Sequence, residues 1–284
     1  PDNTRLLLYQ RRFARLQAID AGYYQDLADH LARMARPGDA MIALPAEQVY
    51  DLAHYSNGAL PIYPLPMTSG SLPKEGEATL VGLSRRYQRV WLVLGEPQPS
   101  ADEQALLRWL AERFYRADDV WYGPLHLVLY APPAEEGGDS DWHQDAVSWE
   151  KGITLEGYRF RDTSVPPGDI LRLDLKWVAT EPVADRLKVF VHLLAEQGQL
   201  MSQRDSEPLD GTFPTTVWIP GEPVVDRIGL GLPLELPAGD YAVVLGLYRP
   251  DSGERLLACC PESDSIVLGS FHVDGGIVSF TPPD

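Results

Sequence analysis

From residue 152 to residue 273, short runs of alternating apolar and polar residues are separated by turns rich in proline, glycine and aspartate. In residues 171–177 every odd-numbered residue is apolar and every even-numbered residue is charged. Successive side chains of a strand point to opposite faces of a sheet, so this is the pattern of a half-buried β-strand. About seven to nine such strands predict an all-β domain, a β-sandwich of the immunoglobulin-like or jelly-roll type.

The first half of the chain alternates predicted helices with predicted strands. Apolar residues spaced by three and four predict a helix over residues 4–35. Residues 40–44 and Arg89–Leu94 are almost wholly apolar runs, typical of buried strands. Ser100 followed by Glu103 is the capping box of a further helix. This alternation predicts a mostly parallel, three-layer α/β domain.

An acidic stretch separates the two halves. Residues 134–150 contain six acids and no lysine or arginine, together with two glycines near their start. We therefore expect an α/β domain at 1–133, an acidic linker at 134–150 and a β-sandwich domain at 151–284. The net charge of −17 repels phosphate groups, so nucleic acid is not an expected partner. The chain begins with Pro1, and we expect it to be a piece of a longer polypeptide.

The motifs of common catalytic and cofactor sites are missing from the sequence. The first predicted strand is followed by Pro45 and two further residues without glycine, which excludes the usual dinucleotide-binding turn. The histidines are scattered, and Cys259 and Cys260 are adjacent, which leaves their redox state open. Asp118 and Asp119 are expected at the end of a helix. We therefore predict no catalytic residue, no metal site and no cofactor, and whether the chain is an enzyme stays open.

Aromatic residues of the second half are candidates for a platform on which a sugar ring could stack. Trp177 falls on the apolar side of its strand and is expected in the core, whereas Trp218 lies in a turn-rich stretch and is the best candidate for partial exposure. Packing in the core is nevertheless the favoured interpretation for Trp218 as well. His192 falls on the strand face opposite Val189 and is expected to be hydrogen-bonded. The full set of candidates is Trp142, Trp149, Tyr158, Trp177, Trp218 and Tyr248.

Several short patterns stand out in the second half of the chain: Lys188 to Leu194, Gln203-Arg204-Asp205 with Pro208, Pro214-Thr215, Trp218, Pro220-Gly221-Glu222, and Leu247-Tyr248 with Pro250 and Gly253. Together they resemble the sandwich domain at the C-terminal ends of large bacterial membrane proteins, many of which look like polytopic glycosyltransferases of the dolichyl-phosphate-mannose protein mannosyltransferase or aminoarabinose transferase class. In residues 31–44 a helix ending in Pro-Gly-Asp leads into a buried strand. In this the first half resembles the soluble α/β segment of the same proteins.

The resemblance implies a non-catalytic part of a membrane protein, on the extracytoplasmic face of the cell membrane. Its expected partners are its own upstream transmembrane region and an acceptor glycan or protein that it positions. His192, Asp205 and Trp218 are the candidate ligand-binding residues. Two alternatives stay open: a free-standing carbohydrate-binding or adhesion module, and an enzyme whose site lies in the cleft between the domains.

Overall fold

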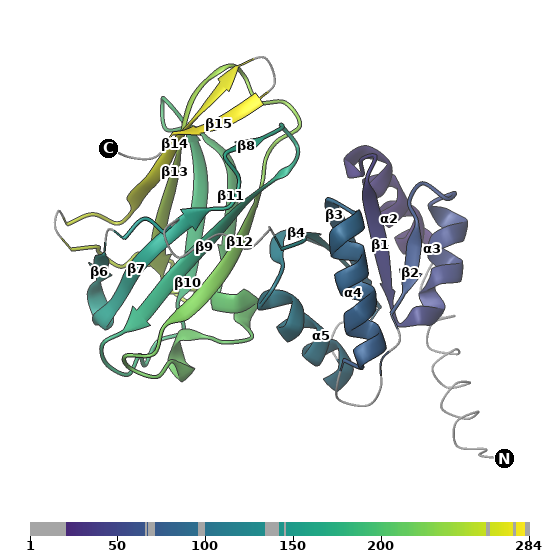
Figure 1. Cartoon of the computed structure of the whole chain (residues 1–284), viewed down its shortest axis with the longest axis horizontal. Coiled ribbons are helices and arrows are strands. Elements are labelled where there is room, and N and C mark those ends of the chain that lie inside the picture. The colour runs from purple at the N-terminus through teal and green to yellow at the C-terminus, as the bar shows by residue number, and fades with distance from the viewer. Residues whose placement is uncertain are drawn as a thin grey trace. The chain divides into compact units, whose positions relative to one another are not determined.

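The computed structural model describes residues 21–65, 67, 72–95, 100–133, 142–144, 146–259, 262–274 and 277–281. The chain divides into two compact units, one of residues 1–106 and 119–130 and the other of residues 107–118 and 131–284. The first unit is mixed α/β, and the second consists mainly of strands (Figure 1). The domain boundaries expected from the sequence stay a prediction.

The first unit contains a mixed sheet with the order β2-β1-β3-β5. Strand β1 (Asp39–Leu44) pairs in parallel with β2 (Ile62–Pro64) and with β3 (Arg89–Leu94). Strand β5 (Leu125–Ala131) then pairs with β3 in the antiparallel direction. Every residue of β1, β3 and β5 is buried, which explains their continuous apolar sequences. The predicted parallel pairing is thus confirmed for β1, β2 and β3, and β5 makes the sheet mixed.

The helices of the first unit begin and end where the local signals indicate. The helix predicted over 4–35 is confirmed as α2 (Ala21–Met34), and residues 4–20 lie outside the described part of the chain. The predicted capping box is also confirmed: Ser100 N donates to Glu103 Oε2 at 2.6 Å, and Glu103 N donates to Ser100 Oγ at 3.3 Å. The remaining helices are η1 (Ala46–Gln48), α3 (Val49–Tyr55), α4 (Lys74–Arg86) and α5 (Ala101–Ala111).

The expectation that Asp118 and Asp119 end a helix is wrong. They lie in strand β4 (Tyr115–Tyr122), since α5 already ends at Ala111. Tyr115 and Ala117 are buried on one face of β4, and Asp118 is exposed. The short alternation from Tyr115 onwards is therefore a strand signal, hidden in the sequence by the strong helical pattern directly before it.

The second unit is a β-sandwich, as the alternating sequence predicts. One layer is formed by β12-β9-β7-β6, the last four strands of a nine-stranded sheet, and β12 also pairs in parallel with β4 at Arg116. The other sheet has the order β11-β10-β13-β14-β15-β8. The strands are β6 (Val147–Trp149), β7 (Ile153–Phe160), β8 (Ser164–Val165), β9 (Ile170–Ala179), β10 (Lys188–Ala195), β11 (Leu200–Ser206), β12 (Val224–Gly231), β13 (Gly239–Tyr248), β14 (Ile266–Asp274) and β15 (Ile277–Thr281), with short 3-10 turns at Glu150–Gly152, Pro208–Gly211 and Thr215–Val217.

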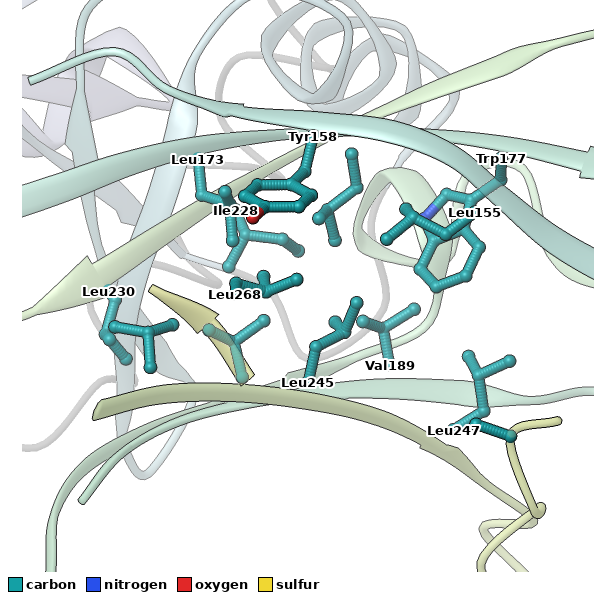
Figure 2. Close-up of a cluster of buried hydrophobic side chains, with 14 of the residues drawn as sticks. Leu155, Tyr158, Leu173, Trp177, Val189, Ile228, Leu230, Leu245, Leu247 and Leu268 are labelled. Carbon is teal, nitrogen blue, oxygen red and sulfur yellow. The ribbon is translucent and has the colours of Figure 1, made fainter. Parts of the chain in front are cut away.

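The apolar faces of the two sheets meet in a common core (Figure 2). Leu173 and Trp177 of β9 reach it from one sheet, and Leu245 and Leu247 of β13 reach it from the other. Trp177 has no exposed surface, which confirms its predicted place in the core. Because side chains alternate along β9, its charged residues must point to the outer face of their sheet.

Candidate functional site

An open groove of about 680 Å³ lies on the outer face of the sheet that contains β7, β9 and β12. All of its described residues belong to the second unit. Register brings three strands together there, since Gly157 of β7 pairs with Lys176 of β9, which pairs with Val225 of β12. The groove is lined by Trp142, Gln144, Ala146, Glu156, Gly157, Lys176 and Val225.

Trp142 reaches the groove because the chain around it runs beside β7. His143 N donates to the carbonyl of Tyr158 at 2.8 Å, and Tyr158 N donates to the carbonyl of His143 at 3.0 Å. This pair of backbone hydrogen bonds, the His143 bridge, requires a residue without a side chain at position 157. A Cβ atom on Gly157 would lie 2.7 Å from the His143 carbonyl oxygen and 3.7 Å from the Trp142 ring. Gly157 therefore permits the close approach that places the indole at the groove.

Gly157→Ala is expected to lower the free energy of unfolding by about 1–3 kcal/mol, because the new methyl group overlaps a backbone oxygen that has little room to move. The change is measured by urea unfolding of the whole chain. The control is Gly231→Ala in β12, where the added Cβ would meet only Ala117 at 4.0 Å. An equal loss of unfolding free energy for both substitutions would show that replacing any glycine in a strand is destabilising. Overlap with the His143 carbonyl would then not be the cause.

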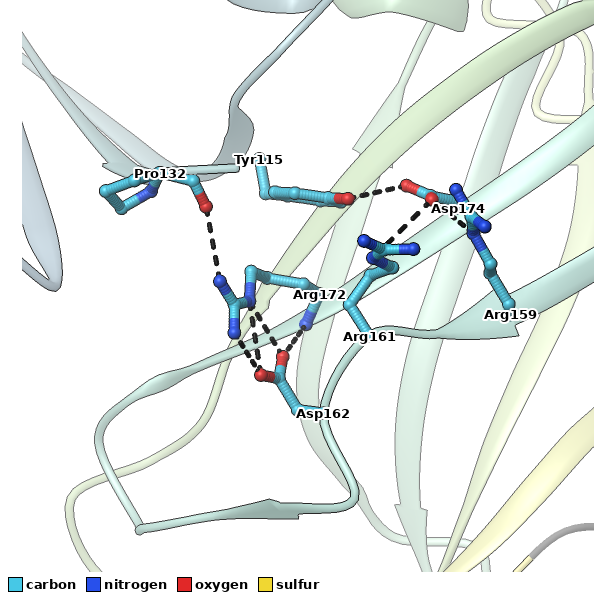
Figure 3. Close-up of polar contacts among 7 residues, drawn as sticks. All are labelled: Tyr115, Pro132, Arg159, Arg161, Asp162, Arg172 and Asp174. Carbon is cyan, nitrogen blue, oxygen red and sulfur yellow. Dashed lines mark hydrogen bonds and ion pairs between the residues drawn. The ribbon is translucent and has the colours of Figure 1, made fainter. Parts of the chain in front are cut away.

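The buried carboxylate of Asp174 positions Arg159, which packs on the Trp142 ring. The Arg159 guanidinium carbon lies 4.4 Å from the centre of the Trp142 ring, a cation–π contact. Arg159 Nε in turn donates to Asp174 at 2.8 Å, and the Tyr115 hydroxyl donates to the same carboxylate at 2.7 Å (Figure 3). Arg161 lies 3.9 Å from it, and Asp174 is only 1% exposed. The indole is thus supported by a chain of contacts that starts at Asp174.

The polar residues of the groove offer both donors and acceptors. Lys176 Nζ lies 3.0 Å from Glu156 Oε2, and both side chains are about two-fifths exposed. Gln144, which is exposed, adds an amide that can donate and accept. An aromatic ring beside such groups matches a ligand that has an apolar face and a rim of hydroxyl groups.

Among the described residues that line the groove, Glu156 is the single carboxylate, and it is paired with Lys176. Enzymes that hydrolyse a glycosidic bond use two carboxyl groups on either side of the bond. In the part of the chain that the structure describes, no three His, Cys, Asp or Glu side chains are grouped as metal ligands would be.

Two of the candidate ligand-binding residues lie together on the outer face of the other sheet. His192 Nε2 is 3.2 Å from Asp205 Oδ1, which confirms that His192 is hydrogen-bonded. Burial alone would raise the pKa of Asp205, but its contacts with His192 and Tyr248 hold that pKa below its usual value. Burial and the neighbouring Asp205 raise the pKa of Tyr248 to about 12. The role of His192 and Asp205 in ligand binding stays a prediction.

Trp218 is packed in the core, as the favoured interpretation of its sequence predicts, and the alternative of partial exposure is wrong, since only 5% of the residue is exposed. The 3-10 turn Thr215–Val217 directs the indole back into the sandwich core, and its Nε1 donates to the carbonyl of Phe213 at 3.1 Å. A turn-rich sequence therefore does not imply an exposed aromatic ring, because the polar N–H is satisfied by the turn itself. Of the aromatic candidates, Trp142 is the one that lines the groove.

The other groove residues are hard to recognise from sequence patterns alone. Lys176 stands on the polar side of a recognisable strand, but that position indicates only exposure. Glu156 reaches the groove because the pairing of β7 with β9 shifts between Leu155 and Gly157, a bulge that no turn residue announces. Cys259 is exposed, and Cys260 lies outside the described residues. No described helix is both long enough and apolar enough to cross a membrane.

Comparison with known proteins finds no matching family model and no matching curated protein. Among solved structures, the C-terminal domain of Wzt is similar at 15% identity, over 51% of this chain and 90% of that chain, with a TM-score of 0.32. A glycosyl hydrolase family 2 member from Bacteroides cellulosilyticus is similar at 13% identity, over 53% of this chain and 21% of that chain, with a TM-score of 0.26. These values place the chain in no family, so its function is argued below from its own residues.

Proposed function

We propose that the second unit is a non-catalytic carbohydrate-binding module and that the Trp142 groove holds the sugar. The observation that carries this proposal is the pairing of a supported indole with polar side chains in one open groove. A pyranose ring presents C–H groups on its faces and hydroxyl groups around its edge, and it therefore matches an aromatic ring flanked by Gln144, Glu156 and Lys176.

The wider setting is a proposal that rests on the resemblance of sequence patterns. In that setting the chain is an extracytoplasmic part of a glycosyltransferase-like membrane protein and binds an acceptor glycan near its own upstream transmembrane region. The immunoglobulin-like or jelly-roll topology and the three-layer form of the first unit are likewise proposed. Reading the gene upstream of Pro1 tests the setting, because it requires a series of hydrophobic spans there.

Trp142→Ala is expected to weaken glycan binding by about tenfold or more, equivalent to about 1.4 kcal/mol, because the ring supplies the apolar surface of the groove. The whole chain is first screened on a glycan array, and the best binder is then titrated by calorimetry. The control is Trp121→Ala, which removes an indole that is 47% exposed and lies outside the groove. Absence of any bound glycan, or equal binding by wild type and Trp142→Ala, would overturn the proposal.

A further inference from the structure

Basic residues are concentrated beside the groove, although the chain as a whole carries a net charge of −17. They project from the outer face of β7, β9 and β12 or from the residue after β7, and on these three strands they outnumber the described acids of the same face, Glu156 and Asp174. Asp162, which follows β7, is already bonded to one of them (Figure 3). The bases are Arg159, Arg161, Arg172, Lys176 and Arg227.

Arg227 stands next to the groove by its register. It pairs with Asp174 in β9, and it lies two residues along β12 from the groove residue Val225. Residues two apart on a strand share a face and are separated by about 7 Å. Arg227 is therefore about one sugar ring away from the Lys176–Val225 pair, on the same side of the sheet.

The carboxylate nearest to Arg227 in register is already occupied by other groups. Asp174 accepts from Tyr115 and Arg159 and has Arg161 at 3.9 Å. Burial and Asp174 raise the pKa of Tyr115, while the positive charges of Arg227 and Arg161 act in the opposite direction. Among the residues that the structure describes, no carboxylate forms an ion pair with Arg227 within 4.0 Å.

We propose that the groove selects an acidic saccharide and that the Arg227 guanidinium binds a carboxylate carried by one of its rings. This inference rests on the proposed carbohydrate-binding function and names its ligand class. A guanidinium presents two parallel N–H donors to a carboxylate, and a partly buried pair of this kind is stronger than a neutral hydrogen bond. The local excess of positive charge attracts an anion and disfavours a cationic sugar.

The test uses two matched ligands: a uronic-acid trisaccharide, and the same trisaccharide after reduction of its carboxyl groups to alcohols. The whole chain is titrated with each by calorimetry. Wild type is expected to bind the acidic ligand about tenfold more tightly than the reduced one. Arg227→Gln is expected to bind the two equally, with its affinity for the reduced ligand unchanged, which also shows that the variant is folded.

Arg108→Gln removes one positive charge from an exposed position of α5 and is expected to keep the wild-type preference. Equal binding of both ligands by wild type would overturn the acidic-saccharide inference and leave the proposed function intact, provided that Trp142→Ala abolishes both. If Arg227→Gln still prefers the acidic ligand, Arg227 is not the residue that binds its carboxylate. Failure of wild type to bind either trisaccharide or any arrayed glycan would overturn both proposals.

Discussion

Replacing Asp174 with asparagine is expected to lower the free energy of unfolding of the second unit by about 3–5 kcal/mol, because removing one partner of a buried ion pair leaves the other charge uncompensated. Asp174 is the carboxylate among Arg159, Arg161 and Arg227, and it is 1% exposed. The asparagine keeps the shape and one acceptor oxygen but removes the negative charge. Urea unfolding followed by tryptophan fluorescence measures the loss.

Glu254→Gln is the matched control for Asp174→Asn. It removes one carboxylate charge from an ion pair with Arg249, but Glu254 is 64% exposed, so the expected loss is about 0–1 kcal/mol. Tyr115→Phe separates the hydrogen bond from the charge, because it removes only the hydroxyl that donates to Asp174 at 2.7 Å. A loss for Asp174→Asn no larger than that for Glu254→Gln would contradict the view that Asp174 holds this arginine group together.

Asp174 also connects the core of the sandwich to the groove. Its neighbours Leu173 and Leu175 are buried in the core, while its own side chain positions Arg159 against Trp142. Asp174→Asn is therefore expected to weaken glycan binding as well, even though Asp174 is not among the groove residues. The alternating sequence explains this connection, because a single strand supplies core residues on one face and supporting residues on the other.

Local sequence signals were sufficient for most of the secondary structure. The buried strands β1 and β3, the capping box at Ser100 and the alternation of β9 each depend on residues within a few positions of one another. Strand β4 was missed because its alternation follows directly on the helical pattern of α5. The sequence left partial exposure of Trp218 open as an alternative to packing, because the burial of Trp218 depends on the fold of a whole turn.

The groove, by contrast, was not predictable from local patterns. Trp142, Glu156, Lys176 and Val225 come from four separate segments, and only strand pairing brings them together. Trp142 was one of several aromatic candidates, and nothing in the sequence distinguished it from the buried Trp149. The distinction came from Gly157, whose missing side chain admits the neighbouring segment, and from Arg159, which packs on the ring.

Asp226→Asn is expected to make the chain more stable than wild type at neutral and alkaline pH, by up to about 4 kcal/mol at about pH 8. Asp226 lies on the inner face of β12 and is 1% exposed. Burial, together with the negative charge of Asp210, raises the pKa of Asp226 to about 7, although Leu209 N donates to it at 2.8 Å and Arg204 is nearby. The folded chain therefore binds this proton more tightly than the unfolded chain.

The direction of the pH effect follows from that difference in proton affinity. Below about pH 4 both states hold the proton, and Asp226 does not change the stability with pH. Between about pH 4 and pH 7 the unfolded chain releases the proton first, so wild-type stability falls as the pH rises, and above about pH 7 the loss is complete. Asparagine cannot ionise, so the variant lacks this part of the pH dependence.

The measurement is urea unfolding of wild type and Asp226→Asn at about pH 5 and about pH 8. The stability advantage of the variant is expected to grow by about 3 kcal/mol between the two. Asp251→Asn is the control, since Asp251 is exposed in a turn and its replacement should give the same small difference at both values. A constant difference for Asp226→Asn would mean that Asp226 is already ionised in the fold. The Asp210–Arg204 pair, 2.7 Å apart beside it, would then have to stabilise the buried charge.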